Sequence, residues 1–248
     1  MRRIYQIDQT PCAFFTAVFS AYADKCEQSA AITSTAFQSA FGDEFISVYP
    51  DEKKAARVVK KLRAIDKNCL YELDCILRTP EPDKEQTAFL YIRRLIEKNA
   101  PVRGMLAFPE IRRAVDLSAR VGTERHRLTG FLRFHETSSG IYYAACTPDN
   151  ELIDLLMPHF CARFKNTPFV IHDVKREIAG VSDGKSWLLA PAKRADVVFS
   201  AREDGFLTLW TEYYRTVAIP ERKNTRQMKN YMPVRYWAFM PEKQSDRI

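Results

Sequence analysis

The spacing of apolar residues changes at about Gly130, and this change constrains the fold more than any other feature of the sequence. Before it, apolar residues recur at the three- to four-residue spacing of a helix face. After about Gly130, they fall in short runs separated by turn-forming residues, as in β-strands. The sequence therefore predicts an α+β fold in which helices flank a mostly antiparallel sheet. We expect residues 1–120 to be rich in helix and to share their core with a sheet-centred part, residues 121–248, in one compact unit.

The same spacing of apolar residues predicts the individual helices and strands. The predicted helices are residues 11–22, 50–65, 71–77, 84–98, 109–121, 151–164 and 205–217. The predicted strands are residues 3–7, 45–49, 130–136, 141–147, 169–173 and 187–190. Residues 137–140, with the sequence TSSG, predict a hairpin loop between two of these strands. The outer face of residues 50–65 is strongly basic, which fits either a solvated surface or a phosphate-binding one.

Charge and hydropathy exclude several classes of protein. Lys and Arg total 38 against 31 acidic residues, a net charge of +7, which is compatible with a polyanionic partner such as nucleic acid. No apolar run approaches the length needed to cross a bilayer, and polar residues interrupt the apolar stretch near the N-terminus. The six cysteines show no paired spacing. We therefore expect a cytoplasmic protein without membrane contact, disulfide or cofactor.

The segment Pro220–Trp237 is the most unusual part of the chain. It carries five basic residues and one acid, interleaved with amides and aromatics, a combination suited to gripping phosphates while stacking bases. The candidate phosphate-binding residues in this segment are Arg222, Lys223, Asn224, Arg226, Arg235 and Trp237. The alternative is a structural tail whose aromatic residues dock into the core while its charges stay in water.

A second cluster lies in the predicted strand at residues 130–136. Alternation along that strand would place Phe131, Arg133 and His135 on one face. A buried arginine there needs either an acidic partner, for which Glu124 and Asp173 are the candidates, or a bound anion.

A third cluster surrounds two histidines. His159 and Arg163 are four residues apart and share a face of the predicted helix, whereas His172 and Asp173 end a strand. Adjacent strand residues point to opposite faces, so His172 and Asp173 are not expected to form a relay with each other. A zinc site made of His159, Cys161 and His172 would lack a fourth ligand, and we predict no metal.

These motifs resemble a bacterial family described as DNA-metabolism or DNA-repair proteins. The resemblance covers nearly the whole chain. It rests on the run Thr123–Phe134, and then on Tyr142-Tyr143-Ala144, Pro148-Asp149-Asn150, His159-Phe160, Arg163-Phe164, Ile171-His172-Asp173, Arg176, Leu209-Trp210, Glu221-Arg222, Asn224, Gln227 and Met232-Pro233 with Arg235-Tyr236-Trp237. Members are typically encoded beside a radical SAM protein proposed to repair or modify DNA, and a related domain is fused to a uracil-DNA glycosylase-like domain. This chain departs from its relatives at Gln9-Thr10-Pro11-Cys12, where they often have an acidic or glycine-rich segment.

Three functions remain open from the sequence. The first is a DNA-binding accessory protein that acts with a radical SAM partner and possesses a groove lined by arginines, namely Arg133, Arg163, Arg176, Arg222, Arg226 and Arg235. The second is an enzyme acting on a nucleotide or nucleobase, with the candidate catalytic residues Glu124, His126, His159, His172 and Asp173 around a pocket. The third is a protein-interaction module, in which internal acids would neutralise the same arginines and an apolar patch would be exposed.

Overall fold

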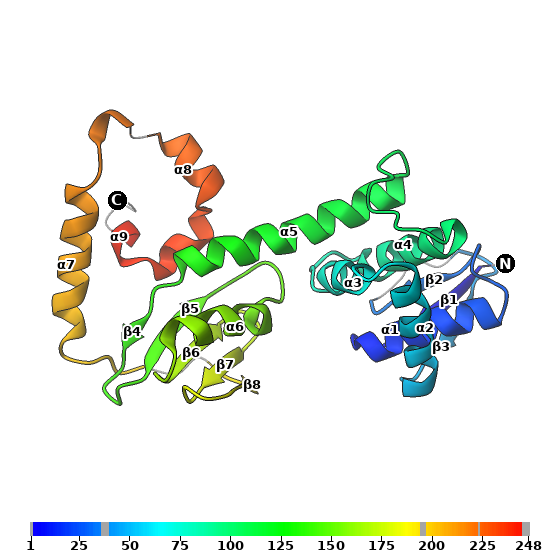
Figure 1. Ribbon diagram of the computed structural model, residues 1–248, viewed down its shortest axis with the longest axis horizontal. Helices are drawn as coiled ribbons and strands as arrows, with labels where there is room; N and C mark the ends of the chain where they lie inside the picture. The colour runs from blue at the N-terminus through cyan, green and yellow to red at the C-terminus, as the bar shows by residue number, and fades with distance from the viewer. Residues whose placement is uncertain (1, 36–39, 194–196, 223, 245–248) are drawn as a thin grey trace. The chain divides into compact units, whose positions relative to one another are not determined.

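The computed structural model describes residues 2–35, 40–193, 197–222 and 224–244. The chain divides into two compact units, Met1–Gly122 and Thr123–Ile248 (Figure 1). This division lies two residues from the expected boundary between residues 120 and 121. No helix of the described residues is both long enough and apolar enough to cross a membrane.

The first unit contains a three-stranded parallel sheet. Its central strand is β1 (Arg3–Gln6), flanked by β2 (Ala31–Thr33) and β3 (Glu44–Ser47). Parallel neighbours require a crossover connection, which α1 (Pro11–Ala23) supplies between β1 and β2. The Thr10 hydroxyl accepts a hydrogen bond from the Ala13 N–H at 3.3 Å and so caps this helix.

Helices supply most of the core of the first unit. They are α2 (Glu52–Ile65), α3 (Cys69–Leu77), α4 (Lys84–Lys98) and the first part of α5 (Pro109–Phe131). Their apolar faces, at helical spacing, meet in one cluster, so this part of the chain has an apolar core of its own. The core includes Tyr5, Phe14, Leu62, Leu73, Ile76, Phe89, Ile92, Leu95 and Leu117. The basic residues of α2 lie on its exposed side.

The second unit contains a five-stranded mixed sheet. Its strands lie in the order β4 (His135–Glu136), β5 (Tyr142–Cys146), β6 (Phe169–Asp173), β7 (Ile178–Ser182) and β8 (Trp187–Pro191). The pair β5–β6 is parallel, and the other neighbours are antiparallel.

Parallel pairing of β5 with β6 is possible because α6 (Ile153–Phe164) connects them and lies across the sheet (Figure 1). The close approach of this helix explains Gly180 on β7, where an added Cβ would lie 2.8 Å from Met157 Cγ and 2.9 Å from Ile153 Cγ2. The expectation of a mostly antiparallel sheet is therefore correct only in part, since it describes three of the four strand pairs of this sheet but not the pair β5–β6 or the sheet of the first unit. One sheet is parallel and the other is mixed, because helical crossovers join strands in both units.

The expected strand over residues 130–136 is also wrong over most of its length. Helix α5 continues to Phe131, and only His135 and Glu136 form a strand. The buried residues Val121, Glu124, Leu128 and Leu132 explain this, because they follow one another at helical spacing. Strand alternation therefore does not describe Phe131 and Arg133.

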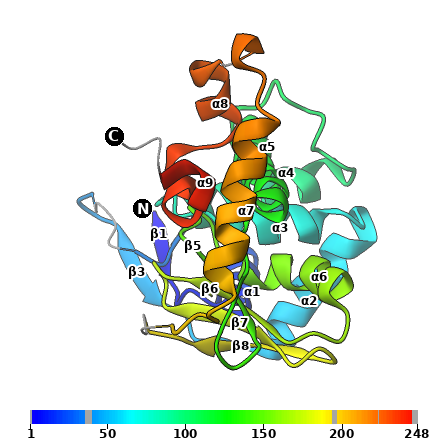
Figure 2. The same ribbon diagram turned by 90° about the vertical axis from the view of Figure 1, so that its left-hand side faces the viewer.

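The last part of the chain is helical. Helix α7 (Glu203–Thr216) is followed by the short 3-10 turn η1 (Pro220–Arg222), α8 (Thr225–Tyr231), the 3-10 segment η2 (Val234–Phe239) and α9 (Pro241–Gln244). Figure 2 shows α7 in front of its own unit, with α9 beside it; the two helices contact each other.

The tail is partly docked and partly exposed. The structural alternative expects Tyr236, Trp237 and Phe239 to dock into the core; Tyr236 and Trp237 are buried, and Phe239 is half-buried. In contrast, the side chains of Arg222 and Arg226 are exposed. One part of this segment is therefore a docked structural tail, and another part leaves its arginines exposed, as a phosphate-binding segment would. Lys223 lies outside the described residues.

Candidate nucleic-acid interface

Glu124 is the centre of a buried network in the second unit. Its carboxylate is 3% exposed and accepts hydrogen bonds from the backbone N–H groups of Asp149 and Asn150, both at 2.9 Å. It also accepts from the Asn150 side chain at 2.7 Å, the Arg235 guanidinium at 3.0 Å and the Tyr236 hydroxyl at 2.8 Å. The second carboxylate on Arg235 is that of Asp149, at 2.9 Å. Glu124 therefore fixes the turn that follows β5 and the tail at the same time.

This network predicts a pH dependence of stability. Burial alone would raise the pKa of Glu124, but the backbone hydrogen bonds from Asp149 and Asn150 and the Tyr236 hydroxyl hold its pKa below the usual value. Because the pKa of Glu124 is lower in the folded state, its ionised carboxylate stabilises the fold. This stabilisation is fully present above the unfolded pKa of about 4.3 and is lost as the pH falls through the folded pKa. We expect Glu124→Gln to reduce the loss of stability on acidification. Urea unfolding at several pH values between about 3 and 7 measures this, and an unchanged acid dependence in the variant would contradict it.

Asp173 and Arg176 form an ion pair that makes further hydrogen bonds to the same turn. Asp173 Oδ2 contacts the Arg176 guanidinium at 2.8 Å, and its Oδ1 accepts the backbone N–H groups of Lys175 and Arg176 at 3.1 and 3.2 Å. Arg176 also donates to the carbonyl groups of Pro148, at 3.0 Å, and Asp149. Four of the candidate residues, Glu124, Asp173, Arg176 and Arg235, thus surround the single turn at residues 148–150.

Both ring nitrogens of His172 have a hydrogen-bond partner. Nε2 lies 2.9 Å from the Ala192 carbonyl, and Nδ1 lies 2.8 Å from the Tyr143 hydroxyl. Because a carbonyl only accepts, Nε2 carries the proton, and Nδ1 of the neutral ring accepts from Tyr143. His172 and Asp173 have separate partners, as strand alternation predicts.

Arg133 is paired with an acid that the sequence did not indicate. Its guanidinium contacts Glu242 Oε1 at 2.7 and 3.0 Å, donates to the Gly130 carbonyl at 2.9 Å and lies 5.3 Å from the centre of the Trp210 ring. Neither Glu124 nor Asp173 is its partner. The charge of Arg133 is therefore matched within the second unit.

The other two candidate catalytic residues are exposed. His126 lies on α5 and His159 on α6. His159 shares the exposed side of α6 with Arg163, as its spacing predicts, and its ring lies edge-on to Phe160 at 4.9 Å between centroids. The five candidates are thus divided between buried networks and separate exposed positions. Among the described residues, no group of three or more His, Cys, Asp or Glu side chains is arranged to hold a metal ion.

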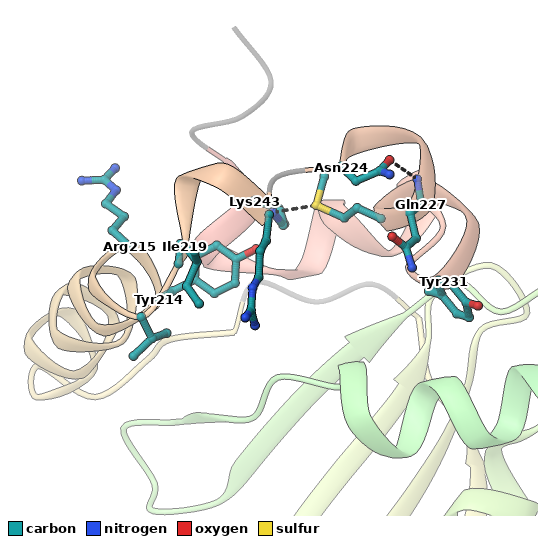
Figure 3. A pocket seen from close by; sticks show the side chains of 11 residues that line it. Tyr214, Arg215, Ile219, Asn224, Gln227, Tyr231 and Lys243 are labelled. Carbon is teal, nitrogen blue, oxygen red and sulfur yellow. Dashed lines mark hydrogen bonds between the residues drawn. The ribbon is translucent and has the colours of Figure 1, made fainter.

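A basic and aromatic hollow lies between α7 and α8, and we refer to it as the α7–α8 pocket. Its volume is about 720 Å³. It is lined by Tyr214, Arg215, Val217, Ala218, Ile219, Arg222, Asn224, Gln227, Met228, Tyr231 and Lys243. Figure 3 shows that these side chains come from the end of α7, the start of the tail and α8, with Lys243 from α9. Basic, aromatic and amide groups are thus gathered in one open cavity.

Local structure explains the shape of the α7–α8 pocket. Asn224 caps α8 by accepting the Gln227 N–H at 2.9 Å (Figure 3). Lys243 lies 3.3 Å from the Met228 sulfur, and its ammonium group is 4.7 Å from the centre of the Tyr214 ring. A buried lysine thus links α7, α8 and the last helix around the cavity.

Three arginines near this pocket have unmatched charges. Arg215 and Arg222 line it, and Arg226 lies on α8. All three are exposed, and in the described part of the chain none of their side chains has an ion pair or hydrogen bond. Trp237, by contrast, is buried and donates to the Met232 carbonyl at 3.1 Å. Of the tail residues singled out in the sequence, Arg222 and Asn224 line the pocket and Arg226 lies on its helix α8. Arg235 is instead paired with Glu124 and Asp149, and Trp237 is buried.

One further polar pair has no signal in the sequence. His135 Nδ1 lies 2.8 Å from Glu203 Oε1, and Glu203 Oε2 accepts the backbone N–H of Glu136 at 2.9 Å. No local motif joins residues so far apart in the chain, so only the fold reveals this pair.

Comparison with known families adds one finding. The model of a family described as a domain of unknown function, DUF4130, matches residues 82–242. Comparison with curated proteins and with solved structures finds no match. The matched range includes α4, α5, the whole five-stranded sheet and all residues of the α7–α8 pocket except Lys243. The chain therefore belongs to the DUF4130 family.

Proposed function

We propose that the second unit binds DNA at the α7–α8 pocket. The observation that carries this proposal is the contrast between two sets of arginines. Arg133, Arg176 and Arg235 are each paired with a buried carboxylate, whereas Arg215, Arg222 and Arg226 have no acidic partner in the described part of the chain. Exposed arginines without an acidic partner are available for phosphate groups.

The neighbouring side chains can contact the base and the sugar of a nucleotide. Tyr231 is 66% exposed and offers a ring on which a base can stack, as in proteins that bind single strands. The side chains of Asn224 and Gln227 line the same cavity and can bond to sugar or phosphate oxygens. Phosphate contacts would supply most of the affinity, with little dependence on sequence.

The proposal predicts the effect of removing one arginine. We expect Arg222→Ala to weaken binding of a fluorescent oligonucleotide about tenfold at low salt, because one charge-assisted contact to phosphate contributes about 1.5 kcal/mol. Fluorescence anisotropy with single- and double-stranded DNA measures this. The matched control is Arg202→Ala, which removes an exposed arginine just before the opposite end of α7 that has no side-chain partner among the described residues. Equal affinities of Arg222→Ala and wild type, or an equal loss in both variants, would contradict the assignment.

The resemblance to DNA-repair proteins suggests which partner proteins this DNA binding serves. We propose that the chain is an accessory protein that presents DNA to a radical SAM repair or modification protein, and that a uracil-DNA glycosylase-like protein is a further partner. Such a role places it in the bacterial cytoplasm. An exposed apolar strip on β8, formed by Trp187, Leu188 and Leu189, is available for a protein partner. Titration calorimetry with the purified radical SAM protein tests this, and no heat of binding with or without DNA would count against it.

A further inference from the structure

We propose that a second hollow, between α7 and the start of β4, binds one unpaired nucleotide and holds its base between aromatic rings. We refer to it as the α7–β4 pocket. It has a volume of about 680 Å³, within the range of small-molecule sites. Its lining includes six aromatic residues, Phe134, Tyr142, Phe164, Phe206, Trp210 and Tyr213. This inference deepens the proposed function, because it assigns a place for one nucleotide of the bound DNA.

Aromatic rings line the pocket from α7 and from the sheet and α6. On one side, Phe164 lies 4.7 Å from Phe134 and 5.4 Å from Tyr142 between ring centroids, so this wall is a packed cluster. On the other side, the α7 residues Phe206 and Tyr213 are 61% and 58% exposed. Exposed rings at helical spacing, facing a cavity, leave apolar surface that a stacked base would cover.

The pocket also contains a polar group that can recognise an edge of a base. The Glu203 carboxylate can only accept, so Nδ1 of His135 carries the proton that bonds Glu203 Oε1 at 2.8 Å. No described residue bonds the other ring nitrogen, Nε2. In the neutral ring it is an acceptor for an amino or imide N–H, the donors found on nucleobases. Because Glu203 is itself fixed by the Glu136 N–H, the orientation of His135 is set before a ligand binds.

The charge in the pocket fits a phosphate. Arg163 lines it, is exposed and has no side-chain partner in the described part of the chain. Arg133 and Glu203 line it too, but Glu242 neutralises the charge of Arg133, and the Glu203 carboxylate is bound by His135 and the Glu136 N–H. A nucleoside 5′-phosphate combines a flat base for the aromatic walls with an anion for Arg163. An apolar peptide or a lipid chain would use neither His135 nor Arg163.

Mononucleotides test the pocket without relying on DNA binding. Titration calorimetry with the four deoxynucleoside 5′-monophosphates and the matching nucleosides is the experiment. We expect wild type to bind at least one monophosphate with a dissociation constant below about 1 mM, and Arg163→Ala to weaken that binding about tenfold while changing nucleoside binding little. Phe206→Ser, a change at an exposed position, should weaken both. Failure of wild type to bind any monophosphate, or unchanged nucleotide binding by Arg163→Ala, would overturn the inference.

The control variant separates this site from the α7–α8 pocket. Arg222→Ala should leave mononucleotide binding unchanged, since Arg222 does not line the α7–β4 pocket. Wild type that binds monophosphates but no DNA would contradict the proposed DNA binding alone. DNA binding that depends on Arg222, with no monophosphate bound, would contradict the nucleotide pocket alone.

Discussion

Replacing Glu124 by alanine is expected to lower the free energy of unfolding of the second unit by about 3–5 kcal/mol. The carboxylate is buried and accepts five hydrogen bonds, from two backbone N–H groups, the Asn150 amide, Arg235 and Tyr236. Alanine would leave these donors without their acceptor and Arg235 without its buried partner. A buried donor left unsatisfied costs about 1–3 kcal/mol, so the combined loss is large.

Urea unfolding, followed separately in the two units by hydrogen exchange, measures the effect. The matched control is Glu124→Gln, which retains one acceptor oxygen and the side-chain volume and should lose less stability. A Glu124→Ala protein that unfolds at the wild-type urea concentration would show that the network does not hold the turn. If that protein were instead stable but inactive in a nucleotide reaction, Glu124 would be catalytic and our structural assignment would be wrong.

Replacing Asp173 by alanine is expected to cost about 3 kcal/mol. Its carboxylate is 1% exposed; it caps the turn after β6 and pairs with Arg176, which in turn holds the carbonyl groups of Pro148 and Asp149. Removing the carboxylate leaves the Arg176 charge without its partner. The unfolding free energy of the second unit, obtained as for Glu124, reports the loss.

The paired variant for this prediction is Asp173→Asn. It keeps an oxygen for the backbone N–H groups of Lys175 and Arg176 but removes the ion pair, so its loss should be the smaller of the two. Full stability in Asp173→Ala together with weaker DNA binding would place this carboxylate at the ligand and not in the fold.

Local patterns predicted many of the elements but not their pairing. The residues of α4 and β6 agree with the sequence prediction, because long apolar periodicity and a short β-branched run between turns are strong local signals. The three residues of β2 and the glycine-containing β7 are too short or too irregular to give such a signal. The expected antiparallel direction does not hold where a helix joins two neighbouring strands, as α6 joins β5 and β6.

The candidate site could be predicted only in part, because long-range partners decide which arginines are free. Arg235 and Glu124 are 111 residues apart, and Arg133 and Glu242 are 109 residues apart. Composition makes Arg222 and Arg235 equivalent members of one basic tail, yet only Arg235 meets a buried acid. The charge available for a ligand is thus a property of the fold.

The most direct test of the account is the salt dependence of DNA binding. Anisotropy titrations with a single-stranded oligonucleotide over several salt concentrations give the slope of log affinity against log salt, about −0.7 for each phosphate neutralised. We expect wild type to show a steep negative slope. The triple variant Arg215→Ala, Arg222→Ala, Arg226→Ala should make that slope shallower by about 2. No binding by wild type at low salt, or the same slope in both proteins, would contradict the assignment of the unpaired arginines to phosphate.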